Sequence, residues 1–259
     1  MILNSLKKTL KTMLFNPIIF FPMLIATITS LFSMNLTSFV LERPLSEMIY
    51  YLDTFMTNDF LLLFLNKYLF EIFIMLASGF IVLAVSIIAF ITLANYAKTN
   101  NLTLAINTSI ENIGQSISLT FFIFIISTLV TILFSLFITI MDLIYEVLPD
   151  QIISVLALII IPIMLIILFT MFLTKLFFVI PATIDNNIKN AIKKSWDFTT
   201  DKFWKSFVFI LVLLLIGFFI ITIFTNLGLF FELSFITAPI GEIITMTFIG
   251  LALSYYYFN

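Results

Sequence analysis

Neither cysteine nor histidine occurs in this chain of 259 residues. Their absence excludes disulfide bonds, thiolate and imidazole metal sites, catalytic triads that use histidine, and imidazole proton relays. The lack of cysteine leaves the redox compartment open. Charged residues are also scarce, at 10% of the chain.

Apolar side chains, in contrast, dominate the composition. They make up 62% of the residues, and the mean hydropathy is +1.23. A soluble domain is about half apolar and a quarter charged. A water-soluble fold of this length would have too little polar surface to cover so much apolar side chain. The composition therefore predicts an integral membrane protein with lipid as its solvent.

Six apolar runs are long enough to cross a bilayer, which takes about 20 residues in a helix. They cover residues 17–40, 68–97, 117–141, 152–180, 206–227 and 236–257. We expect an all-α polytopic protein in which residues 1–259 form a single domain of six transmembrane helices. The second and fourth runs exceed one crossing, and Pro162 is expected to kink the fourth. The first run is too long for a signal peptide, so it is interpreted as an uncleaved span.

The charged residues are sorted by the gap between spans in which they lie. One set of gaps holds ten of the twelve basic residues and four of the fourteen acids. The ten basic residues are Lys7, Lys8, Lys11, Lys98, Lys175, Lys189, Lys193, Lys194, Lys202 and Lys205. Cytoplasmic loops collect Lys and Arg, so both termini are expected to be cytoplasmic in a multi-pass protein of the cell membrane. The acidic and aromatic connection 41–66 is expected to form a helix on the outer surface.

A short basic amphipathic helix is predicted over residues 187–199, before the fifth span. Its apolar face carries Ile188, Ala191, Ile192, Ser195 and Trp196, and lysines fill the other face. Such a helix is suited to the headgroup layer. The candidate contacts with lipid headgroups are Lys189, Lys193, Lys194, Trp196, Lys202, Trp204 and Lys205. A membrane boundary explains this mixture of aromatic and basic residues better than a nucleic-acid stacking surface does.

The same pattern precedes the first and third spans. Residues 102–113 carry an apolar stripe, and residues 105–109 align with residues 191–195. At the N-terminus, residues 6–9 align with residues 192–195. The sequence thus predicts interfacial helices before spans one, three and five, and three parallel helix-pair units. Chance likeness among basic amphipathic turns is the alternative explanation.

Residues 177–211 combine an aromatic-x-x-Pro turn, a helix reading Ala-aliphatic-Lys-Lys-Ser-Trp and an aromatic-rich start of the next span. The positions concerned are Pro181, Ala191, Ile192, Lys193, Lys194, Ser195, Trp196, Phe203 and Trp204. This pattern resembles the signature of integral membrane proteins grouped with the glycerophosphoryl diester phosphodiesterase membrane domain. The resemblance implies their six-span architecture and not phosphodiesterase activity, which belongs to a separate catalytic domain. The C-terminal residues 255–259 depart from the family pattern because they lack a basic tail.

Ionisable side chains at the ends of spans are the remaining candidates for chemistry. Lys175 lies near the cytoplasmic end of span four, which favours anchoring at the headgroups over a functional role. Glu71 follows Lys67 by one turn at the outer end of span two, and Glu242 lies at the outer end of span six. We favour the interpretation that both carboxylates lie at the membrane interface, where each is either paired with a base or solvated. If both carboxylates faced the interior, Glu71 and Glu242 would form an outer vestibule for a cation or proton.

Hydroxyl side chains provide most of the polarity within the spans. Thr128, Thr131, Ser135 and Thr139 repeat at helical spacing in span three, which favours a helix contact over a conduit. Gly250 and Ser254 form a small-x-x-x-small pair in span six, a sign of close helix approach. The sequence has no phosphate-binding loop and no nucleophile elbow, and no metal or cofactor is expected.

Two functions fit these features. The favoured one is a non-catalytic membrane scaffold or accessory subunit that packs against lipid, another membrane protein or a second copy of itself. The alternative is a transporter or permease for a small or lipidic molecule, with a cavity among its helices. An intramembrane enzyme is least favoured, because it would need chemistry from Ser, Thr, Tyr or Lys alone. Nucleic acid is not expected as a partner.

Overall fold

A computed structural model of the protein describes residues 2–50, 58–147 and 174–258. Every regular element in these residues is a helix, so the prediction of an all-α fold is confirmed for this part of the chain. The long helices are α2 (Phe21–Tyr50), α3 (Asn58–Thr99), α5 (Ile113–Val147), α9 (Phe203–Phe230) and α10 (Ser234–Phe258). The shorter ones are α1 (Ile2–Phe15), the 3-10 helix η1 (Pro17–Phe20), α4 (Leu102–Glu111), α7 (Val179–Thr183) and α8 (Ile188–Asp201).

Five stretches in the described part of the chain are long and apolar enough to cross a membrane. They are Pro17–Val40, Lys67–Thr99, Ile113–Leu133, Phe203–Phe230 and Ser234–Phe258. They correspond to predicted spans one, two, three, five and six, as expected of an all-α multi-pass membrane protein. Most of predicted span four, including Pro162, lies outside the described residues. Its final part forms the short apolar stretch Thr174–Thr183.

The connection between the first two long helices differs from the prediction. Residues 41–50 continue α2, and residues 58–66 already belong to α3, so the described parts of 41–66 form no separate surface helix. Residues 51–57 lie outside the described residues. A continuing helix satisfies its own backbone hydrogen bonds, and no turn is required where it leaves an apolar layer. Within α3, Tyr68 has non-helical backbone angles (φ −114°, ψ 20°), so α3 bends at the residue where span two was predicted to begin.

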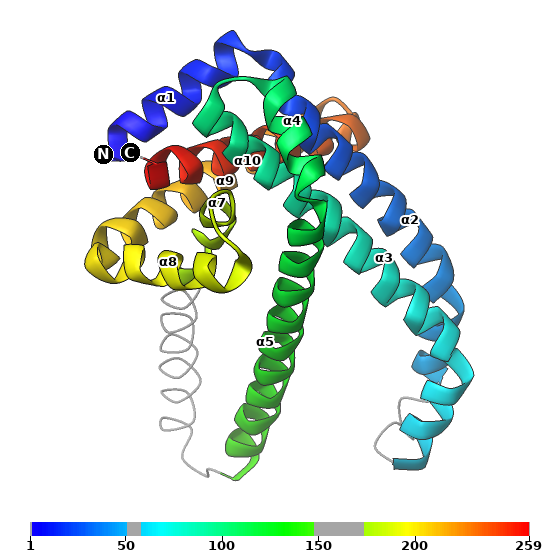
Figure 1. The fold of residues 1–259 in the computed structure, drawn as a ribbon. Coiled ribbons are helices and arrows are strands. Elements are labelled where there is room, and N and C mark those ends of the chain that lie inside the picture. Colours follow the sequence, from blue (N-terminus) through cyan, green and yellow to red (C-terminus); the bar gives the residue numbers. More distant parts are fainter. Residues whose placement is uncertain (1, 51–57, 148–173, 259) are drawn as a thin grey trace.

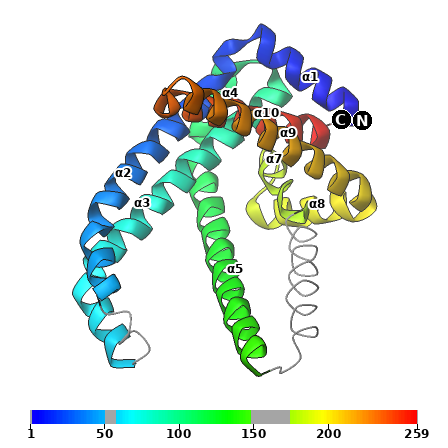
Figure 2. The ribbon, with the colours of Figure 1, turned by 180° about the vertical axis from the view of Figure 1, so that it is seen from behind.

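The long helices diverge from one end of the molecule. α2 packs against α3, α9 packs against α10, and α5 contacts α3. Both views show the α2–α3 pair and α5 leading away in different directions from the end where α1, α4 and the chain termini lie (Figures 1 and 2). The two termini lie side by side at this end because α1 packs against α10.

The short helices α1 and α4 lie at this end, and α8 lies on the other side of α9 and α10 from α1 (Figures 1 and 2). We call α1, α4 and α8 the collar helices. α4 packs on α3, α8 packs on α7, and α1 packs on α10 (Figure 1). The collar helices α4 and α8 therefore each rest on the helical segment that precedes them in the sequence. α1 differs from them, because it packs on α10, the most C-terminal helix of the described residues. The three helix-pair units predicted from the sequence stay a prediction.

Three apolar clusters within the described residues fill the space beneath the collar helices. They include Leu93 with Tyr255, Phe209 with Tyr256, and Ile91 with Ala191. The first joins η1, α2, α3, α4 and α10. The second joins α9 to α10, and the third joins α3, α5, α7 and α8. The ends of α3 and α10 and the α7 segment thus form the common centre of the fold.

Gly250 brings α10 close to α3. A Cβ atom on Gly250 would lie 2.8 Å from Cδ1 of Leu93 and 2.8 Å from Cδ1 of Phe90. One turn later, the Ser254 hydroxyl donates to the Gly250 carbonyl at 2.7 Å, so this polar group is satisfied within its own helix. The close approach predicted from Gly250 and Ser254 is therefore confirmed.

Candidate functional site: the collar helices and the adjoining cavity

The collar helices share a burial pattern at equivalent positions. Two small side chains, one turn apart, are fully buried in each helix. These are Ser5 and Thr9 in α1, Ala105 and Ser109 in α4, and Ala191 and Ser195 in α8. The residue directly after the second of these two positions is exposed instead: Leu10 by 51%, Ile110 by 59% and Trp196 by 41%. The alignment made from the sequence thus places similar residues at similar depth in all three helices.

Small side chains at these positions allow each collar helix to lie close to the segment beneath it. Their hydroxyl groups are satisfied at the same time. Thr9 Oγ1 donates to the Ser5 carbonyl at 2.9 Å, and Ser109 Oγ donates to the Ala105 carbonyl at 2.8 Å. Burial therefore leaves no unpaired hydroxyl on these two faces.

Side-chain hydrogen bonds also join each collar helix to its supporting segment. Asn95 Nδ2 in α3 donates to Ser109 Oγ at 3.1 Å. Ser195 Oγ donates to the carbonyl of Lys175, and the hydroxyls of Thr12 and Tyr255 lie 3.0 Å apart. Each contact fixes the position of a collar helix along the helix that carries it.

Two of the collar helices begin with the same cap. Asn101 Oδ1 accepts from the Leu104 N–H at 3.2 Å, and Asn187 Oδ1 accepts from the Asn190 N–H at 3.0 Å. Asparagine is favoured here because its side chain satisfies an N–H group that has no partner within the first turn. Asn101 and Asn187 are equivalent in the alignment, so α4 and α8 start at the same point of the repeated pattern.

The apolar face of α8 packs mainly against protein. In α8, Ala191 is buried, and Ile188 and Ile192 are half-buried. Trp196 alone among the predicted apolar residues of this helix is exposed. Periodicity identifies an apolar face but does not distinguish a lipid neighbour from a helix.

All seven predicted headgroup contacts lie on exposed surface of α8 and the start of α9. They are Lys189, Lys193, Lys194, Trp196, Lys202, Trp204 and Lys205. Trp204 is the more exposed tryptophan, at 71%. Its ring meets those of Phe203 and Phe207 edge-on, with centroids 5.5 Å and 6.0 Å away. The structure therefore gathers cations and an aromatic surface in one region.

Three lysines lie over aromatic rings in this part of the fold, the most distant being Lys202, whose ammonium is 5.3 Å from the centroid of the Phe198 ring. The Lys175 ammonium is 3.8 Å from the centroid of the Trp196 ring, and the Lys8 ammonium is 4.2 Å from that of Tyr255. Such contacts contribute about 0.5–2 kcal/mol, depending on desolvation. They hold the ammonium groups of Lys175 and Lys8 beside these rings, and headgroup anchoring by Lys175 stays a prediction.

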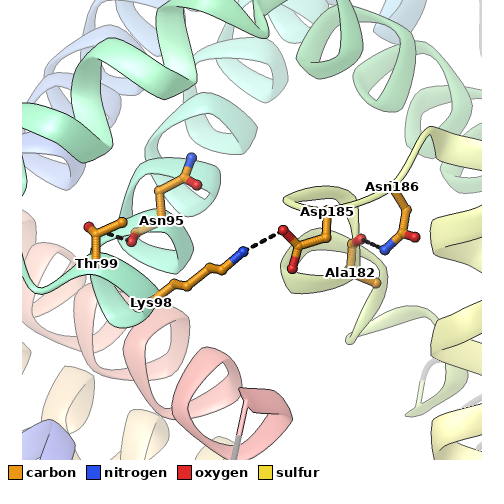
Figure 3. A network of polar contacts seen from close by, with 6 residues as sticks. All are labelled: Asn95, Lys98, Thr99, Ala182, Asp185 and Asn186. Carbon is orange, nitrogen blue, oxygen red and sulfur yellow. Dashed lines mark hydrogen bonds and ion pairs between the residues drawn. The ribbon is translucent and has the colours of Figure 1, made fainter.

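An ion pair connects α3 to the turn between α7 and α8. The Lys98 ammonium at the end of α3 contacts Oδ1 of Asp185 (Figure 3). Hydrogen bonds order both ends: Thr99 Oγ1 donates to the Asn95 carbonyl at 2.8 Å, and Asn186 Nδ2 donates to the Ala182 carbonyl at 2.8 Å. The pair is half-exposed, at 44% and 53%, so solvent screening limits its contribution.

The C-terminal tyrosines have a packing role that sequence reasoning missed. Tyr256 is fully buried and stacks on Phe209 with ring centroids 4.1 Å apart. Phe198 from α8 lies 5.1 Å from the Tyr257 ring and 5.1 Å from the Phe178 ring. The sequence signal for this packing is the run of three tyrosines at residues 255–257.

The carboxylates proposed for an outer vestibule are both half-buried. Glu71 lies in α3 and Glu242 lies in α10, next to Gly241, whose added Cβ would be 2.8 Å from Cβ of Phe224. Neither carboxylate lines the cavity described below. A vestibule shared by Glu71 and Glu242 therefore stays a prediction.

The hydroxyl stripe of span three lies in α5. Thr128, Thr131 and Ser135 of this stripe are exposed, and the hydroxyls of Thr128 and Thr131 each donate to a backbone carbonyl of α5 at 2.9 Å. The helix contact predicted for Thr128 and Thr131 does not agree with their exposure. The side chain of Thr139 lies outside the described residues.

A half-open cavity of about 400 Å³ lies between α3, α5, α10 and the stretch Thr174–Thr183. Its lining is almost entirely apolar and includes Phe90, Phe122, Ile126, Phe177 and Leu253. Ser127, Thr131 and Ser254 contribute hydroxyls to the described lining. All three donate to carbonyls of their own helices. The cavity is therefore suited to an apolar occupant.

No group of three or more Asp or Glu side chains is arranged for metal binding in residues 2–50, 58–147 and 174–258. Comparisons of the chain with family models, curated proteins and solved structures found no match.

Proposed function

We propose that the protein is a non-catalytic membrane scaffold or accessory subunit of the cell membrane, with both termini in the cytoplasm. The observation that carries this proposal is the common construction of the collar helices. Each keeps its small residues buried against the fold and turns an apolar residue outward, and two of them also expose lysines. Such a surface is built for contact and contains no arrangement that suggests a reaction.

In this proposal the collar helices lie at the cytoplasmic headgroup layer of a six-span protein. Leu10, Ile110 and Trp196 would enter the boundary between headgroups and acyl chains, as the apolar residues of interfacial helices do. The lysines of α1 and α8 would contact anionic headgroups, at about 1 kcal/mol per lysine. The resemblance to the membrane domain grouped with glycerophosphoryl diester phosphodiesterases belongs to this proposal and concerns architecture alone. The partners would be lipid, another membrane protein or a second copy of the chain, and not nucleic acid.

The two tryptophans of the chain provide an intrinsic test, since both are among the proposed headgroup contacts. The full-length protein would be placed in lipid nanodiscs as Trp196→Phe, which leaves Trp204, and as Trp204→Phe, which leaves Trp196. Phospholipids brominated near the headgroup should quench Trp204 strongly, because its side chain is 71% exposed. Trp196 should be quenched less, because its ring faces Lys175. Quenching of neither tryptophan, or quenching only by bromine at the chain ends, would contradict the proposed depth.

The lysines can be tested separately by lipid enrichment. Changing both Lys193 and Lys194 to Gln should reduce the anionic lipid retained around the protein in mixed nanodiscs. A contribution of about 1 kcal/mol per lysine corresponds to about a fivefold change in local preference for each charge. Lys67→Gln is the matched control because it removes a lysine predicted to lie at the other membrane face. Equal loss of anionic lipid in both variants would contradict the proposed orientation.

A transporter or permease for a lipidic molecule is the second candidate, and the apolar cavity is the observation that favours it. Flux of a fluorescent lipid between leaflets of reconstituted liposomes would distinguish a transporter from a scaffold. Alanine at Glu71 and Glu242 should reduce that flux if the two carboxylates form an outer vestibule. Flux equal to that of protein-free liposomes would support the scaffold.

A further inference from the structure

We propose that the cavity between α3, α5, α10 and Thr174–Thr183 binds one hydrocarbon chain of a membrane phospholipid. This inference goes beyond the scaffold function, which requires only the collar surface.

The chemistry of the lining selects the occupant. A volume of about 400 Å³ lies within the range of ligand pockets, about 300–1,000 Å³. Water is a poor occupant, because a buried water needs two to four polar partners and the hydroxyls of Ser127, Thr131 and Ser254 already donate to their own helices. An empty cavity would leave its aromatic and aliphatic walls without dispersion contacts. A flexible hydrocarbon chain needs no polar partner, and it supplies the dispersion contacts that the walls would otherwise lack.

The position of the cavity places it among the membrane-crossing segments. The helices α3, α5 and α10, which supply most of its lining, each contain one of the five candidate spans. Phe90 lies nine residues before the end of α3 at Thr99, which is about 14 Å along the helix axis. Half of a typical hydrocarbon core measures about 15 Å. A chain that enters the half-open side therefore comes from the hydrocarbon layer itself.

Lys175 is the cation nearest in sequence to the cavity lining, and its charge would complement a phosphate group. Leu176 and Phe177 line the cavity, and Lys175 directly precedes them in the chain. The ammonium of Lys175 is held 3.8 Å from the centre of the Trp196 ring, so it is positioned beside α8. A phospholipid with its chain between α5 and α10 would therefore place its phosphate on the side of this cation. This combination favours a phospholipid chain over an uncharged hydrocarbon.

Photochemical labelling tests the proposal on the intact protein. The chain would be incorporated into detergent-free nanodiscs that contain a phospholipid with a diazirine in its acyl chain, and labelled residues would be located by mass spectrometry. We expect label on cavity residues of α5, such as Phe122 and Ile126, above that on exposed α5 residues such as Leu129 and Leu133. Ser127→Phe would fill the cavity and should reduce the cavity label several-fold. Thr128→Phe is the matched control, because Thr128 is adjacent, exposed and not part of the lining.

Two results would overturn the proposal. One is labelling of cavity residues at the level of Leu129 and Leu133 in the unmodified protein. The other is equal cavity labelling in the Ser127→Phe and Thr128→Phe proteins. Thr131→Phe fills the same cavity from the next turn and replaces Ser127→Phe if that variant does not fold. Tryptophan quenching at the collar helices is unaffected by the occupancy of the cavity, so failure here and failure of the proposed scaffold function are distinguishable.

Discussion

Replacing Gly250 by leucine should force α10 away from α3. The carbon atoms that an added Cβ would meet, on Leu93 and Phe90, lie only 2.8 Å away. Leu93 is fully buried, so its side chain cannot turn outward to solvent or lipid without repacking. Phe90 lines the cavity and can shift toward it, so alanine at position 250 should be tolerated better than leucine.

The expected loss in the free energy of unfolding follows from comparison with Gly79 in α3, where an added Cβ would meet nothing within 4 Å. Leucine at either glycine gains up to about 1 kcal/mol of helix propensity. Overpacking at Gly250 should cost about 1–3 kcal/mol, a term that is absent at Gly79. Gly250→Leu should therefore be about 1–3 kcal/mol less stable than Gly79→Leu.

Reversible unfolding in mixed micelles provides the measurement, with the free energy of unfolding compared between the two variants. A double-mutant cycle with Phe90→Ala sharpens the test. Removing the Phe90 ring should relieve the clash, with a coupling energy of about 0.5–3 kcal/mol between the two sites. Equal unfolding free energies for Gly250→Leu and Gly79→Leu, together with zero coupling, would refute this account of the α3–α10 contact.

Two further predictions concern the region around the collar helices. Tyr256→Ala should reduce the unfolding free energy by about 3–5 kcal/mol through loss of the stack on Phe209, whereas Tyr256→Phe should change it little; similar losses in both would point to the hydroxyl instead of the ring. Lys98→Gln should lower the unfolding free energy by less than about 1 kcal/mol, because both partners of the ion pair with Asp185 are half-exposed. A larger loss, measured at physiological salt, would show that solvent does not screen this pair.

Hydropathy was sufficient to locate the five long apolar helices of the described residues, because the bilayer sets the length of an apolar run. The run 206–227 lies within α9, and 236–257 lies within α10. Hydropathy did not predict where α2 ends. Residues 41–50 are more polar than the span before them, but polarity does not stop a helix whose backbone hydrogen bonds are internal. Where the chain does bend, at Tyr68, the predicted boundary of span two coincides with the bend.

The candidate site was only partly accessible from the sequence. Alignment of the collar segments identified Ser109 and Ser195 as equivalent, and both are fully buried. Nothing in the periodicity indicated that protein would cover these faces, because a lipid tail and a packed helix are both apolar neighbours. The cavity could not be predicted from the sequence for a related reason. Its lining comes from four segments far apart in the chain, and each contributes residues that are ordinary for a membrane span.

The contact between α1 and α10 has a consequence for biosynthesis. α1 is synthesised long before α10, the helix that supports it, which begins at Ser234. At a translation rate of about 5–20 residues per second, α1 waits on the order of 10–50 s for its partner. During this interval Ser5 and Thr9 lack the helix that covers them in the finished protein. Nascent chains halted before residue 234 should therefore leave the amino-terminal segment accessible to proteases, and release of the full chain should protect it.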